Sequence, residues 1–345
     1  MRRREFMTLL GGAAAVWPLA ARTQTAMPVI GYLGSASPTA WAARLQAFRQ
    51  GLSESGFEEG RNVAIDYRWA EDKFDRLPEL ANQLVRRNVA VLVMSGSVQA
   101  ALAAKAATTT IPIVFETGAD PVAVGLVPSL SRPGGNVTGI TTLTFETGPK
   151  RLEIMHEALP AANPIAVLVN PTAGEAVGRQ ATDLEATAAK LRLQLLKLHA
   201  SNDRELEAAF SVMQDNHVGG LVIAADPFAN SRIKEIAALA LRYGVPAIFV
   251  NPQFATFGGL MSYGGNIVET HRLAGIYAGR ILKGEKPADL PVIQGTKIRA
   301  DHQPEDGKGA WANAAAVAAW PRRRGDRIKW HVCSWHFSDM ERCPT

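Results

Sequence analysis

Residues 89–115 read VAVLVMSGSVQAALAAKAATTTIPIVF, and this stretch decides the fold. Two short apolar runs, 89–94 and 111–115, enclose a segment of helical composition at 98–107. Nearly continuous apolar runs separated by helices are typical of parallel strands that are covered on both faces of a sheet. The stretch therefore predicts a strand–helix–strand unit of an α/β protein.

The same alternation extends in both directions from this unit. We expect further strands at 29–33, 63–67, 165–169, 193–198, 218–224 and 245–250. Helical periodicity covers 41–52, 74–87, 173–190, 204–216, 231–243 and 267–282. The pattern predicts two parallel-sheet α/β lobes joined by a hinge: 27–140 plus about 262–293 forms lobe 1, and 141–261 forms lobe 2. Trp41 and Phe48 share one helix face and are expected in the core.

The first 26 residues have the features of an export signal. Arg2, Arg3 and Arg4 form a basic start, and the apolar run that follows, 7–16, is too short to span a bilayer. The sequence of residues 3–7 also fits the twin-arginine pattern. We expect a soluble periplasmic protein whose signal peptide is cleaved near residues 21–26.

Composition excludes several classes of function. Residues 27–298 hold 25 basic and 25 acidic side chains, so the positive charge of the whole chain comes from its ends and predicts no nucleic-acid partner. Both cysteines, Cys333 and Cys343, lie in the last stretch, which argues against thiol catalysis and a disulfide framework. The histidines show no metal-ligand spacing, and His271, next to Arg272, is expected on the surface. We therefore expect no catalytic residue, metal or cofactor.

Polar residues follow the predicted strands at the point where each strand ends. In open parallel sheets, ligands bind outside the carboxyl ends of the strands. A helix N-terminus there favours a carboxylate, and an aspartate there can hold an ammonium group, so the set suits an amino acid or similar zwitterion. The candidate ligand-binding residues are Ser35, Ser97, Thr117, Asp120, Asn170, Asp226 and Tyr263.

Each candidate taken alone has a structural alternative. Ser37, Asn170 and Asp203 have the positions of helix caps, and an aspartate before proline is also a turn signal. Tyr263 could stack on a ligand or pack in the core. The strand-end pattern on two facing lobes is more specific than any one of its members.

Several motifs resemble those of a known family. They are Gly31–Ser35, Asp66–Glu71, Leu77–Ala81, Ala103–Thr108, Ser131–Gly139, Ala225–Phe228, Gly259–Gly264 and Gly279–Gly284. Over 27–298 the chain is similar to the ABC transporter substrate-binding protein family that includes the TrpX-type tryptophan- and tyrosine-binding proteins. The resemblance implies a type I periplasmic binding fold, three hinge crossings, ligand capture in the cleft, and delivery to a membrane permease with its ATPase.

The last segment, 299–345, departs from this pattern. It holds four of the seven tryptophans and both cysteines. The codons allowed for Ala300–Asn313, read one base later, permit LIINLKTAKALGL, and those for Trp320–Ile328 permit GRADEVIE and then a stop. Both are family-like, so we infer one inserted base near codon 299. The protein would then lack its last native strand and helix, expose a sheet edge, and carry a disordered tail.

The sequence thus predicts an extracytoplasmic solute-binding component of an ABC importer, monomeric or weakly dimeric, with no catalytic activity. One alternative is a periplasmic sensor that reports its ligand to a membrane receptor. A less favoured one is an exported α/β enzyme, for which the chain offers no triad, metal set or cofactor fingerprint. A cytoplasmic repressor shares the fold class, but the chain begins with an export signal where a helix-turn-helix would lie.

Overall fold

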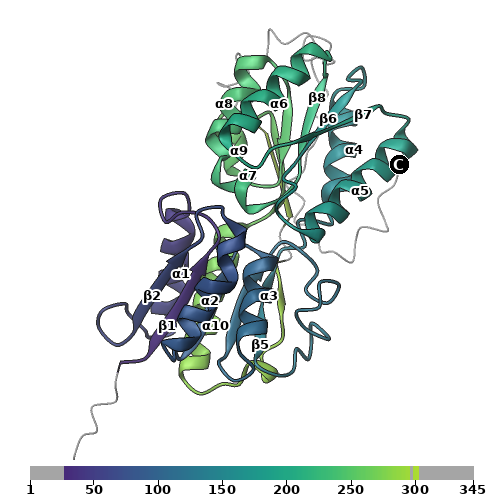
Figure 1. The fold of residues 1–345 in the computed structure, drawn as a ribbon. Helices are drawn as coiled ribbons and strands as arrows, with labels where there is room; N and C mark the ends of the chain where they lie inside the picture. Colours follow the sequence, from purple (N-terminus) through teal and green to yellow (C-terminus); the bar gives the residue numbers. More distant parts are fainter. Residues whose placement is uncertain (1–26, 296–297, 303–345) are drawn as a thin grey trace, which may run out of the picture.

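The computed structural model describes residues 27–295 and 298–302, in two lobes that are each built around one sheet (Figure 1). The expected signal peptide, and the expected aberrant segment from 303 onward, lie outside the described residues. The sequence prediction of a two-lobed α/β protein with parallel sheets is confirmed.

The sheet of the first lobe has the order β11-β5-β4-β3-β1-β2, and all its pairs are parallel. Its strands are β1 (Val29–Gly34), β2 (Ala64–Trp69), β3 (Val91–Ser95), β4 (Ile113–Thr117), β5 (Val137–Thr141) and β11 (Ile293–Gln294). Its helices are α1 (Ala42–Glu54), α2 (Leu77–Arg86), α3 (Val98–Ala107) and α10 (Ile267–Leu282), with 3₁₀ turns at Phe74–Arg76 and Pro287–Asp289.

Two apolar clusters fill the two faces of this sheet. Helices α2 and α3 cover one face, where Leu84 and Phe115 are buried. Helices α1 and α10 cover the other, where Phe48 and Tyr277 are buried. Inward-facing side chains on both faces explain why the strands read as continuous apolar runs.

The sheet of the second lobe has the order β12-β10-β9-β8-β6-β7. Its strands are β6 (Ile165–Val169), β7 (Leu195–His199), β8 (Gly220–Ile223), β9 (Ala247–Phe249), β10 (Met261–Gly265) and β12 (Ile298–His302), and only β12 pairs antiparallel. Its helices are α4 (Gly148–Ala158), α5 (Glu175–Leu191), α6 (Asp203–Asp215), α7 (Pro227–Ser231), α8 (Ile233–Tyr243) and α9 (Gln253–Thr256).

Both lobes repeat one strand order, β2-β1-β3-β4-β5 and β7-β6-β8-β9-β10. The order reverses between β1 and β3 and again between β6 and β8, and such switch points are where open α/β sheets bind ligands. The described chain passes between the lobes after β5, after β10 and after β11, as the family resemblance implies. The two switch points therefore lie at the edges that face each other.

Several boundaries differ from the sequence prediction. The expected lobe boundary at 262 falls inside β10, which belongs wholly to the second sheet. Strands β5 and β10 were not predicted, because threonine and glycine interrupt their apolar residues. Helix α1 begins at Ala42, and Ser37 instead accepts a hydrogen bond from the amide of Ala40. Residues 299–302, within the segment expected to be aberrant, pair with β10 as part of β12.

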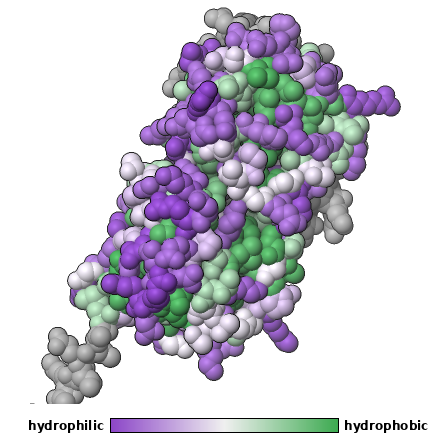
Figure 2. Space-filling view, in the orientation of Figure 1, coloured by the Kyte–Doolittle hydropathy of each residue, from purple (hydrophilic) through white to green (hydrophobic). Residues whose placement is uncertain are grey.

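The visible surface is mostly polar. On the face shown in Figure 2, hydrophilic residues cover much of both lobes, and the apolar areas of the upper and lower lobes are separate. Among the residues that the structure describes, no helix combines the length and the apolar character needed to cross a bilayer.

Candidate functional site

A cleft lies between the two lobes, at the strand ends that face each other. It holds about 360 Å³ of empty space, counted with the solvent at its mouth. Its walls come from loops after β3, β4 and β5 in the first lobe and from the segment after β8 in the second. The lining residues are Arg44, Gly96, Glu116, Gly118, Thr142, Thr144, Phe145, Ala225, Asp226, Pro227, Asn230 and Ile267.

The first lobe contributes one buried charge of each sign to the cleft. Glu116, the fourth residue of β4, is 4% exposed, and its Oε1 accepts a hydrogen bond of 3.1 Å from the hydroxyl of Thr270 on α10. Arg44 on α1 is also buried, and its guanidinium lies 4.7 Å from the centre of the Trp41 ring. Burial lowers the pKa of Arg44, and the nearby Glu116 charge acts in the opposite direction.

His271 lies beneath this wall and not on the surface, so the sequence prediction for it is wrong. It is 1% exposed because it shares the inward face of α10 with Ala274 and Ala278. Its Nδ1 lies 2.7 Å from the carbonyl oxygen of Ile267, which can only accept, so Nδ1 carries the proton. Burial lowers the pKa of His271, and its Nε2 therefore accepts a hydrogen bond of 2.7 Å from Ser95.

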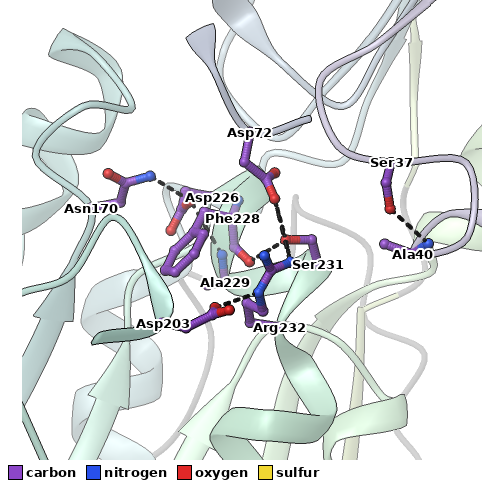
Figure 3. Close-up of polar contacts among 10 residues, drawn as sticks. All are labelled: Ser37, Ala40, Asp72, Asn170, Asp203, Asp226, Phe228, Ala229, Ser231 and Arg232. Atoms are coloured by element: carbon purple, nitrogen blue, oxygen red, sulfur yellow. Dashed lines mark hydrogen bonds and ion pairs between the residues drawn. The ribbon is translucent and has the colours of Figure 1, made fainter. Parts of the chain in front are cut away.

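The second lobe contributes Asp226, which caps the short helix α7. One oxygen, Oδ1, accepts hydrogen bonds from the amides of Phe228 and Ala229 and from the side chain of Asn170, at 2.7, 3.3 and 3.3 Å (Figure 3). The residue is 3% exposed, and burial raises its pKa to about 6 against the opposing effect of these donors. Asp226 thus has one oxygen occupied by the main chain while its side chain lines the cleft.

Polar contacts connect the lobes beside the cleft. Arg44 donates a hydrogen bond of 2.9 Å to Asn230 Oδ1 of the second lobe. In the loop after β2, Asp72 Oδ2 accepts hydrogen bonds from Ser231 Oγ at 2.9 Å and from Arg232 Nη1 at 3.5 Å (Figure 3). We call the Asp72, Ser231 and Arg232 contacts the interlobe latch. They connect the two lobes directly.

The structure places the seven predicted site residues in different surroundings. Asp226 lines the cleft, and Asp120 lines a neighbouring hollow between the lobes with Arg179 and Gln180 of α5. The other five do not line the cleft: Ser97 caps α3, Thr117 accepts from the amide of Ala119, Asn170 contacts Thr172 and Asp226, Ser35 is fully buried, and Tyr263 packs against the core of the second lobe.

Sequence reasoning missed Glu116, Arg44 and Asn230. The sequence does mark Glu116, because it directly follows the apolar run 111–115 and is the one charged residue of β4. Arg44 lies on the buried face of α1, three residues after Trp41, but a periodicity argument counts apolar residues only. Asn230 follows a cap and a proline, and nothing in the sequence marks it.

No group of metal-ligating side chains that could hold an ion occurs among the described residues. Among the described residues, eight buried side-chain nitrogen or oxygen atoms have no hydrogen-bond partner, and one of them, Glu116 Oε2, belongs to a residue that lines the cleft. Burying such groups unpaired is unfavourable, and native proteins retain few of them. An unpaired carboxylate oxygen at the cleft indicates that Glu116 serves binding and not stability alone.

Comparison with known proteins assigns the chain to a family. The model of the ABC transporter substrate binding protein family matches residues 36–299. The chain belongs to this family. The match includes every residue that lines the cleft.

Similar proteins share this architecture. A tyrosine-binding protein of Clostridioides difficile (strain R20291) is 28% identical over 247 residues, which are 72% of this chain and 70% of that protein. The ABC domain from Streptococcus pneumoniae in complex with L-Trp has a TM-score of 0.71 at 22% identity, covering 82% of this chain and 94% of that one. The ligand-free, open structure of a substrate binding protein with adhesive properties from Clostridium difficile has a TM-score of 0.57 at 25% identity, covering 83% and 95%.

The family fixes the general role of the cleft. The chain is a substrate-binding protein of the ABC transporter type, and the cleft between its lobes is the site at which both sheets present their switch points.

Proposed function

We propose that this protein is the extracytoplasmic substrate-binding component of an ABC importer, which captures an amino acid or similar small solute and delivers it to a membrane permease with its ATPase. One observation carries the proposal: buried charges of both signs, Arg44, Glu116 and Asp226, line one cleft and come from both lobes. A zwitterion presents the complementary charges. The tyrosine-binding relative supports an amino-acid ligand.

Hinge closure supplies the signal to the permease in this proposal. A solute that contacts both walls binds the closed form more tightly than the open one, and so shifts the population toward it. The interlobe contacts at Asn230, Ser231 and Arg232 support this view, since they can form only when the lobes approach.

The binding step is tested by thermal unfolding of the full chain against amino acids and small carboxylates. A solute at ~100 times its dissociation constant should add about 2.7 kcal/mol of stability. Cooperative unfolding with no shift for any solute would contradict the binding role. The delivery step is tested by adding the loaded protein to liposomes that hold the permease and ATPase: ATP hydrolysis should rise. Binding without this stimulation would favour the sensor alternative.

Export, quaternary state and the altered C-terminus are further parts of the proposal. N-terminal sequencing of the periplasmic form should begin between residues 22 and 27, and light scattering should give a monomer or weak dimer. Sequencing the locus should show one extra base near codon 299. A chain with the frame restored should unfold at a higher temperature, because it regains its last helix and the family-like residues after Ile298. We expect no turnover of any bound solute.

A further inference from the structure

We propose that the cleft selects solutes that carry a protonated amine, and that Glu116 of the first lobe and Asp226 of the second lobe bind this amine from opposite sides. The inference rests on the proposed function and names the chemistry of its site. It starts from one atom: Glu116 Oε2 is buried and has no hydrogen-bond partner, whereas Oε1 is held by Thr270.

No neighbour of Glu116 among the described residues forms a hydrogen bond with its Oε2. His271 Nε2 lies 3.7 Å away, but it is unprotonated, since Nδ1 carries the proton and Ser95 donates to Nε2. Arg44 is near enough for its charge to offset that of Glu116, but its hydrogen bond goes to Asn230 and its guanidinium stacks on Trp41. Within the described part of the chain, no lysine or arginine forms an ion pair with this carboxylate.

The opposite wall repeats the arrangement. Asp226 Oδ1 accepts three hydrogen bonds, and within the described residues no hydrogen bond occupies Oδ2. Asp226 and Glu116 line the same cleft from different lobes, so each wall offers one carboxylate oxygen. An ammonium group has the donors to meet both.

Charge decides between an amine and a neutral solute. A sugar hydroxyl can donate to a carboxylate, but it leaves the negative charge uncompensated in a buried site. A cation that contacts both carboxylates removes this penalty at each of them. Arg44 offsets one of the two negative charges, which leaves an excess of one for the solute to neutralise. The cleft therefore favours an amine over a polyol.

The position of the two carboxylates also connects recognition to closure. In an open form the amine meets only one wall, and the second carboxylate reaches it when the lobes close. The amine therefore makes an additional interaction in the closed form, which is the differential affinity that a population shift requires.

The test uses the full chain and probes that share one ring. L-tyrosine and tyramine carry the amine, and 3-(4-hydroxyphenyl)propanoate lacks it. A wider panel contains the other L-amino acids and aliphatic diamines on one side, and neutral hexoses, pentoses and inositol on the other. Affinities are measured by calorimetry for the wild type, Glu116→Gln and Asp226→Asn, with Asp66→Asn as the matched control. Asp66 is a largely buried carboxylate of β2 in the first lobe that pairs with Arg68 and Arg87 and does not line the cleft.

We expect binding of amine-bearing probes, with at least about tenfold weaker binding of the matched probe without the amine. Glu116→Gln and Asp226→Asn should each weaken amine binding about 10- to 100-fold, because each loses a charged hydrogen bond. Asp66→Asn should stay within about twofold. Thermal unfolding checks that each variant folds, and the two cleft variants are independent of each other.

Three results would overturn the proposal. If a neutral solute binds tightly and no amine-bearing probe binds, the solute-binding function stands and the proposed selection for an amine is rejected. Amine binding that both cleft variants leave unchanged would reject the two carboxylates as its site. A folded protein that binds no probe of either panel would reject this inference and the proposed function together.

Discussion

Replacing Asp72 by asparagine should open the protein by weakening the interlobe latch. Asparagine preserves the size of the side chain and suits the backbone, since Asp72 has a φ of 61° and asparagine tolerates this left-handed region better than most residues. The substitution removes the charge that Ser231 and Arg232 meet, while a weaker bond from Ser231 to the amide oxygen can remain.

The magnitude follows from the two contacts. Replacing a charged by a neutral acceptor for Ser231 loses about 1 kcal/mol. Arg232 is 29% exposed, and its separation from Asp72 is 3.5 Å, so this screened pair contributes only about 0.5 to 1 kcal/mol. Burial raises the pKa of Asp72, which means that desolvation already offsets part of the gain. A net loss of about 1.5 kcal/mol lowers the closed-to-open ratio roughly tenfold.

Small-angle scattering and ligand titration measure this change together. The radius of gyration without solute should rise toward that of an open form, and the apparent dissociation constant should rise by up to about tenfold. Asp203→Asn is the matched control, because Asp203 pairs with the same Arg232 at 2.6 Å but belongs to the same lobe. Equal changes in the two variants, or no change in Asp72→Asn, would refute the reasoning.

Three further changes test the energetics of the fold. Burial raises the pKa of Asp226 to about 6, above that of an unfolded aspartate, so the folded state binds the proton more tightly. The stability of the wild type relative to Asp226→Asn should therefore fall by about 3 kcal/mol as the pH rises from about 4 to about 6 and then stay constant, as urea unfolding at several pH values would show. Gly275→Ala should destabilise the protein by about 1 to 3 kcal/mol, because the added Cβ would meet the carbonyl of Phe48 where α10 crosses α1. Gly178→Ala, on an exposed part of α5, should instead stabilise it by about 0.5 to 1 kcal/mol. The opposite order of melting temperatures for the two variants would contradict this packing. Gln180→Leu removes an acceptor from the buried guanidinium of Arg151 and should lower the unfolding free energy by about 3 kcal/mol, whereas Gln180→Glu, which supplies a counter-charge, should lose less.

The fold was predictable because most strands lie between two covered faces. Such strands need apolar side chains on both sides, and the runs at 29–33 and 165–169 record this requirement directly. Strand β5 depends less on apolar side chains, because a buried threonine hydroxyl can donate to a nearby main-chain carbonyl. Thr138 donates to the carbonyl oxygen of Leu290, and Thr141 donates to that of Ala119. These long-range partners do not show in a local pattern, so the strand was missed.

The location of the candidate site was predictable from the sequence, but the residues that line it were not. The rule for strand ends depends on topology alone, and it located the cleft as soon as two parallel sheets were expected. Which side chain faces the cleft depends on contacts that distant segments make. Glu116 faces the cleft with one oxygen free because Thr270, 154 residues away, occupies the other. His271 was predicted on the surface because its neighbour is charged, although its helix face is apolar.

The hydrogen-bonding capacity of each side chain explains why Ser97 and Asn170 are not among the residues that line the cleft while Asp226 is. A strand end that opens a helix must supply an acceptor to the first amides of that helix. Ser97 gives its single oxygen to the amide of Ala100, and Asn170 gives its oxygen to Thr172 and its amide to Asp226. A carboxylate has two oxygens, so Asp226 caps α7 with one, and the other is available for the solute contact that we propose. At a switch point that also begins a helix, an acidic residue is therefore the better candidate for contact with a ligand than the serine or asparagine of a neighbouring strand end.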